Sequence, residues 1–153
     1  MKITAQEEYG LRCLLQVALQ SEGAKLASLE NIAKAEGLTS DYAAKLLMTL
    51  RNANLVDSIR GKSGGYKLSR PPEKIYLDEV IRALSGDLFE DNACSLFTAK
   101  ESECVHIECC TLRSMWISIS QLLCNALGTI SLKTLLDKDD LAKKLLVIKE
   151  YSA

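Results

Sequence analysis

The sequence lacks any apolar run approaching the ~20 residues needed to cross a bilayer, so we expect no membrane partner. Its first eight residues turn acidic without the apolar stretch or cleavage site of a secretion signal, and we therefore expect a cytoplasmic protein. No carboxylate pair, nucleophile–base pair or cofactor-binding glycine motif stands out, so we expect no enzyme. Repeats and low-complexity segments are also missing. What remains is a 153-residue chain, 48% apolar and 25% charged, which fits one globular domain or a small domain with an appendage.

Charge is distributed unevenly along the chain. A net charge of −1 gives no general attraction to nucleic acid. From Lys45 to Lys74, however, seven basic residues face only two acidic ones, a local charge of +5, and residues 86–108 carry a local −5. A basic segment of this kind is either a docking surface for phosphate or an ordinary solvated face.

The first half of the chain has the order of a helix-turn-helix. Thr4 and Glu7 form a capping box, so we expect a helix that ends near residues 21–23. Ser28 can cap a second helix that stops at Gly37. Thr39 or Ser40 can then cap a third helix, whose apolar stripe is Leu46, Leu47 and Leu50. Two short helices across a tight glycine turn are typical of DNA-binding proteins, in which the second helix enters the major groove.

A β-hairpin should follow directly. Residues 55–60 and 66–69 have strand character, a glycine-rich basic tip separates them, and Pro71-Pro72 ends the second strand. A glycine loop alone is only a flexible turn, but a hairpin after a helix-turn-helix is a wing. The expected fold is therefore mostly α with a small β-hairpin wing: a winged helix-turn-helix domain plus a long dimerisation helix.

The second half contains that long helix. A shorter helix over residues 78–84 precedes the aperiodic segment 87–109, and a helix from about 111 to 127 follows. Its apolar stripe extends over about five turns, through Leu112, Met115, Trp116, Ile119, Leu122, Leu123, Ala126 and Ile130. The stripe packs either within its own chain or, as we favour, in a homodimer. We thus divide the chain into a DNA-binding domain (1–85), a cysteine-rich loop (86–110) and a dimerisation helix with its tail (111–153).

Four of the six cysteines lie within residues 94–110. Without a secretion signal, disulfides are not expected, and metal or redox chemistry becomes the leading explanation for this group. The other two, Cys13 and Cys124, fall at apolar helix positions and are expected in or near the core.

Three separate stretches resemble the IscR/NsrR/CymR family of small bacterial winged-helix regulators. These are the opening through Arg12, the run Leu50–Leu68 with Arg60-Gly61 and Gly64-Gly65-Tyr66, and Cys110–Trp116. The resemblance implies a homodimer that binds palindromic double-stranded DNA. It places four residues of the recognition helix against the DNA and the wing in the minor groove; the candidate contacts are Ser40, Asp41, Tyr42, Lys45, Arg60 and Lys62.

Cluster-binding members of the family hold iron–sulfur with three cysteines, the last two separated by five residues. Cys104 and Cys110 reproduce that spacing, and Cys94 is the third candidate although nine residues separate it from Cys104. Glu8, from the partner subunit, matches the position of the fourth ligand. Some relatives use a histidine at the position of Arg113, which cannot bind iron. His106 is therefore the other candidate for the fourth ligand. Cys109 is expected to be a bystander. The cluster would be [2Fe-2S] or [4Fe-4S] and would sense redox state, nitric oxide or iron.

Two further interpretations stay open. One is a cluster-free regulator of the same fold, controlled by thiol chemistry or a partner protein. The other is an iron–sulfur or zinc redox protein. The sequence leaves open whether the regulator is a repressor or an activator.

Overall fold

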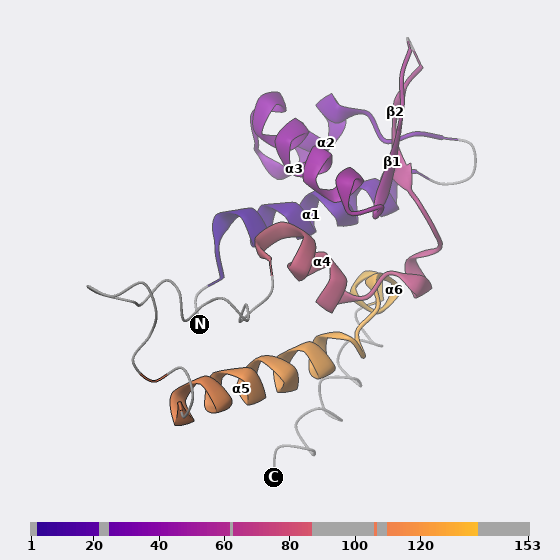
Figure 1. Ribbon diagram of the computed structural model, residues 1–153. Coiled ribbons are helices and arrows are strands. Elements are labelled where there is room, and N and C mark those ends of the chain that lie inside the picture. Colours follow the sequence, from indigo (N-terminus) through magenta and orange to yellow (C-terminus); the bar gives the residue numbers. More distant parts are fainter. Residues whose placement is uncertain (1–2, 22–24, 62, 87–105, 107–109, 138–153) are drawn as a thin grey trace.

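The computed structural model describes residues 3–21, 25–61, 63–86, 106 and 110–137. Within these residues the chain is mostly helical with one antiparallel hairpin, which confirms the predicted fold class (Figure 1). The elements are α1 (Ala5–Gln20), α2 (Leu29–Glu36), α3 (Ser40–Asn52), β1 (Val56–Ile59), β2 (Gly65–Leu68), the 3-10 helix η1 (Pro72–Lys74), α4 (Leu77–Ser85), α5 (Thr111–Leu127) and α6 (Leu132–Leu136). None of the described helices is long and apolar enough to cross a membrane.

The helix boundaries follow the capping residues that the sequence predicts. Thr4 accepts a hydrogen bond from the Glu7 N–H, and the Glu7 carboxylate accepts one from the Thr4 N–H in return. That backbone donor holds the pKa of Glu7 below its usual value. Ser28 caps α2, which ends at Gly37 with a φ of 66°, and Thr39 caps α3. The left-handed backbone at position 37 is the conformation that glycine adopts without steric cost.

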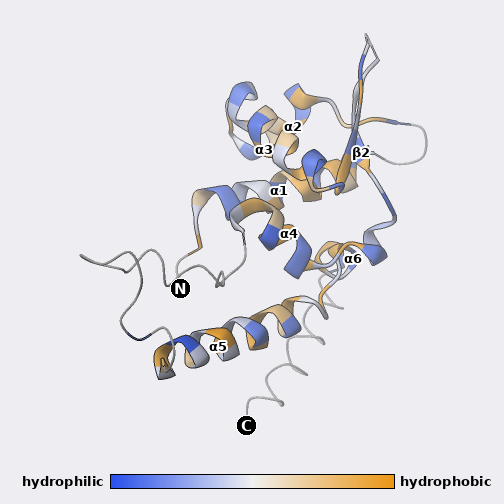
Figure 2. Ribbon diagram, in the orientation of Figure 1, coloured by the Kyte–Doolittle hydropathy of each residue, from blue (hydrophilic) through white to orange (hydrophobic). Residues whose placement is uncertain are grey.

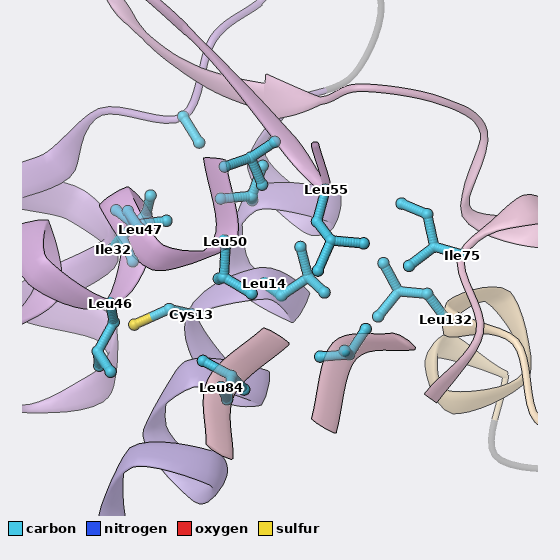
Figure 3. Close-up of a cluster of buried hydrophobic side chains, with 14 residues drawn as sticks. Cys13, Leu14, Ile32, Leu46, Leu47, Leu50, Leu55, Ile75, Leu84 and Leu132 are labelled. Carbon is cyan, nitrogen blue, oxygen red and sulfur yellow. The ribbon is translucent and has the colours of Figure 1, made fainter. Parts of the chain in front are cut away.

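The core lies where α1, α3 and α4 meet (Figure 3). Cys13, Leu14 and Val17 of α1 are fully buried, as are Leu47 and Leu50 of α3. These positions repeat at helical spacing, so each helix buries one face and leaves the other to solvent. The buried stripe of α3 thus determines which of its residues point away from the protein.

The hairpin is joined to a third strand-like segment that the sequence did not predict. β1 pairs with β2 in the register Val56↔Leu68 to Ile59↔Gly65. Ala27, between α1 and α2, forms a bridge with Tyr66 through two backbone hydrogen bonds of 2.8 Å. A single bridging residue produces no alternating pattern, which is why sequence analysis missed it. The bridge attaches the base of the wing to the helix-turn-helix.

The long helix α5 leads back into this core at its end. Leu77 donates a backbone hydrogen bond to Ile130, and Leu132 donates one to Ile75 at 2.7 Å. Ile130 and Leu132 are buried as a result. No residue of α5 itself is buried, although the helix contacts α4. Apolar and polar residues alternate along α5 (Figure 2). The domain boundary at residue 111 stays a prediction. Leu132, which follows α5, packs into the same core as α1, α3 and α4.

Candidate DNA interface and cluster site

The outer face of α3 carries the predicted recognition residues. Ala43, Leu46, Leu47 and Leu50 are buried on the inner face, so the helix cannot rotate without exposing them. Ser40, Asp41 and Lys45 consequently lie exposed to solvent. Three of the four predicted α3 contacts are therefore free to meet a ligand.

The fourth, Tyr42, has a second contact that the sequence did not indicate. It is half-buried, and its ring meets that of Tyr9 on α1 edge-to-face, with centroids 6.2 Å apart and planes at 79°. Its backbone N–H donates to the Thr39 hydroxyl at 3.3 Å. Tyr42 thus connects the recognition helix to α1, and the half-buried side chain is only partly open to solvent.

The wing projects beyond α3, as Figure 1 shows for β1 and β2. Arg60 is exposed just after β1, whereas Lys62 lies outside the described residues. Gly64 is required at the tip, because a Cβ there would lie 2.3 Å from the carbonyl oxygen of Ile59. Arg51 of α3 donates to the Ser58 hydroxyl at 3.3 Å, which links the recognition helix to the wing.

The basic residues between Lys45 and Lys74 form two groups: one is bonded within the protein and the other is exposed. Arg70 forms an ion pair with Glu79 at 2.5 Å and also donates to the carbonyl oxygens of Asn54 and Lys74, so it holds the fold together. Lys45, Arg60, Lys67 and Lys74 are exposed. Sequence analysis had not singled out Lys67, which lies on β2; period-two alternation along that strand would have placed it on the solvent side.

Of the candidate cluster ligands, the structure describes Cys110 and Glu8. Cys110 is the N-cap of α5, and its sulfur accepts a hydrogen bond from the backbone N–H of Arg113 at 3.4 Å. The sulfur thus lies at the N-terminus of α5 with a backbone donor directed at it, and cysteine sulfur is the usual protein ligand of iron–sulfur clusters. Cys94, Cys104 and Cys109, which we expect to be a bystander, lie outside the described residues. The chemistry at Cys110 therefore fits an iron–sulfur ligand.

Glu8 is exposed in the first turn of α1, and its carboxylate accepts no hydrogen bond within the described residues. Arg12, one turn later, instead pairs with Glu36 of α2 at 2.5 Å and covers the Tyr9 ring at 5.5 Å. The hydrogen bond that Arg12 donates to the Glu36 carboxylate raises the pKa of Arg12. Arg12 therefore donates its hydrogen bond to α2 rather than to Glu8, although the nearby Glu8 charge also contributes to the raised pKa of Arg12.

The other two cysteines that the structure describes, and the single histidine, differ in burial. Cys13 is fully buried, and this burial raises the pKa of its thiol to about 11, which confirms it as a core residue. Cys124 is half-buried on α5, and His106 is exposed. No group of three or more histidines, cysteines or acids that could hold a metal forms within the described part of this single chain.

Comparison with known proteins identifies the family. Residues 3–138 match the Rrf2 family, described as iron-dependent transcriptional regulators. The chain belongs to the Rrf2 family. The match covers all the described helices, and members of the family bind DNA. Similar proteins named IscR and CymR confirm the resemblance drawn from the sequence.

Individual Rrf2-family relatives support this. A putative HTH-type transcriptional regulator of Synechocystis is 39% identical over 88 residues, 58% of this chain and 59% of that protein. The IscR regulator of Xenorhabdus nematophila is 31% identical over 140 residues, 92% of this chain and 82% of that protein. The structure of CymR, the global cysteine regulator of Bacillus subtilis, has a TM-score of 0.64 at 32% identity, covering 88% of this chain and 95% of that one. The chain thus spans about three fifths of the Synechocystis protein.

Proposed function

We propose that this Rrf2-family regulator binds palindromic double-stranded DNA as a homodimer and senses redox state, nitric oxide or iron through a cysteine-held iron–sulfur cluster. The observation that carries the DNA-binding part is the orientation of α3. Its buried inner stripe leaves Ser40, Asp41 and Lys45 exposed, and Arg60 is exposed on the wing just after β1. A helix inserted in the major groove with an arginine in the adjacent minor groove suits this arrangement.

The exposed apolar face of α5 supports the dimer. Five large side chains on that face are 40% to 69% exposed in the single chain: Leu112, Met115, Trp116, Ile119 and Leu122. A continuous patch of this kind marks a protein–protein interface more often than a free surface. A second copy would cover it by symmetry, and a two-fold dimer presents two recognition helices, which matches a palindromic site.

The proposed cluster ligands are Cys94, Cys104 and Cys110 of one chain with Glu8 of the other. When bound, the cluster would supply sensitivity to oxidants or small molecules. Cys110 fixes the loop to the start of α5, and Glu8 lies on α1, which packs against α3. An oxygen donor is more exchangeable than a thiolate on iron, so Glu8 is the ligand whose release would alter the contact between subunits.

A cluster-free regulator is the second candidate. The similarity to CymR, a cysteine regulator, favours it, as does the nine-residue spacing from Cys94 to Cys104. In that case Cys110, with its N–H donor at the helix start, would act as a reactive thiol rather than a ligand.

Anaerobic purification separates the two candidates. A cluster protein should absorb in the visible range, with iron and sulfide present in matching amounts, and Cys104→Ala or Cys110→Ala should abolish this absorption. Cys109→Ala is the matched control and should leave the spectrum unchanged. A colourless, iron-free parent that still binds DNA would instead support thiol control.

A separate experiment tests whether Glu8 of one chain binds the cluster held by the cysteines of its partner. Glu8→Ala should retain some colour but shift the spectrum, because water can replace an oxygen donor. Mixed dimers of Glu8→Ala and Cys110→Ala chains keep one complete site only if Glu8 acts across the interface. About half the parental cluster, with the parental spectrum, is then expected; an unaltered spectrum in the Glu8→Ala homodimer would remove Glu8 from the site and leave His106 or a small ligand.

A further inference from the structure

The outer face of α3 contains one residue whose chemistry differs from that of its neighbours. Asp41, Lys45, Met48 and Asn52 are all exposed and are spaced by four, three and four residues. At 100° per residue they fall within about 60° of one another, opposite the buried stripe. They form a single line along the helix, which we call the outer line.

Met48 is the only apolar member of the outer line, and it is 51% exposed. The core is filled on the opposite side by Leu46, Leu47 and Leu50, so Met48 has no part in packing this helix. A single exposed apolar residue is ordinary on a protein surface. Its place in the middle of the line proposed to face DNA is what gives it meaning.

Side chains that flank Met48 on α3 are already engaged within the protein. The Thr49 hydroxyl donates to the Lys45 carbonyl oxygen at 3.2 Å, and Arg51 donates to Ser58 on the wing. Met48 forms none of these bonds and keeps a flexible, polarisable thioether free. At position 48 the outer line therefore offers an apolar contact and no hydrogen bond donor.

We propose that Met48 reads the 5-methyl group of a thymine in the major groove; this inference rests on the proposed DNA-binding function. The thymine methyl is the apolar group that base edges present in that groove. With a rise of about 1.5 Å per residue, Met48 lies roughly 4.5 Å along the helix from Lys45, a little more than one base-pair step. Met48 then specifies thymine at the position next to the base pair that Lys45 contacts.

Removing the methyl group from the DNA tests this. The binding site is first obtained by selection from random duplexes with the purified protein, and each thymine is then replaced singly, in both half-sites, by deoxyuridine. One position should weaken binding of the parent about fourfold per half-site, and about fifteenfold for the palindrome. In Met48→Gln the parental loss at that position should disappear, while Met48→Leu should preserve it.

Lys45→Ala is the matched control on the same line: it should weaken binding overall yet keep the deoxyuridine effect. Circular dichroism should show unchanged folding for the exposed position 48 variants. A site without thymine there, a parent insensitive to every deoxyuridine, or a Met48→Gln variant with the parental sensitivity would each overturn the inference while leaving DNA binding intact. A parent that enriches no sequence would overturn the proposed function itself and the inference with it.

Discussion

Replacing Leu122 by aspartate tests the proposed dimer face most directly. Leu122 is 69% exposed in the single chain, so the fold of one chain loses little when this side chain changes. In a dimer formed through α5, the same position would be covered by the partner helix. The substitution should therefore act on assembly and spare the monomer.

The expected size of the effect follows from the exposed face. The five apolar side chains leave on the order of 400 Å² of apolar surface per chain, comparable to the largest patches on stable monomers. Covering two such faces contributes roughly 20 kcal/mol before association costs of about 4–15 kcal/mol. A symmetric dimer would bury two new carboxylates; at about 2 kcal/mol each, the dissociation constant rises about 1,000-fold.

Sedimentation of the purified protein over a dilution series measures this, with circular dichroism as the check on folding. The dissociation constant of the Leu122→Asp dimer should exceed the parental value about 1,000-fold, and Ile119→Asp should behave in the same way. Gln121→Asp is the matched control, because Gln121 is exposed on the opposite side of α5. A Leu122→Asp variant with the parental dissociation constant, or a Gln121→Asp variant that dissociates as readily as Leu122→Asp, would show that the stripe is not the interface.

Three other outcomes are expected. Arg60→Ala should weaken DNA binding and relax the preference for A·T-rich flanks without affecting the dimer; fluorescence anisotropy with unchanged affinity would contradict the wing assignment. Gly64→Ala, whose Cβ would lie 2.3 Å from a backbone oxygen, should distort the wing and lower DNA affinity while the melting temperature changes by only a few degrees. Burial raises the pKa of Cys13 from 9.0 to about 11, so the unfolded chain loses this proton first and stability falls between those pH values. In urea unfolding, the stability advantage of the parent over Cys13→Ala should shrink from pH 8 to pH 10.5, and a constant difference would refute the assignment.

Much of the fold could be predicted because its signals are local. The capping box of Thr4 and Glu7 and the left-handed Gly37 depend on residues three or four apart, and the structure has both. Helical periodicity likewise identified the buried face of α3 and the buried position of Cys13 on α1, since a helix must turn its apolar side to the core. The recognition face follows from the same arithmetic: once Leu46, Leu47 and Leu50 are buried, Lys45 must face outward.

The rest depends on residues that meet only through folding. The edge-to-face contact between Tyr9 and Tyr42 joins helices far apart in sequence, and the bridge between Ala27 and Tyr66 has no local pattern. Charge counting could not separate Arg70, which pairs with Glu79, from the exposed Arg60, because only the tertiary structure shows which cation already has a partner. The sequence by itself determined the helices, their buried faces and the family; the tertiary structure decided which polar side chains hold the fold and which are left for DNA, because that choice depends on distances between residues remote in sequence.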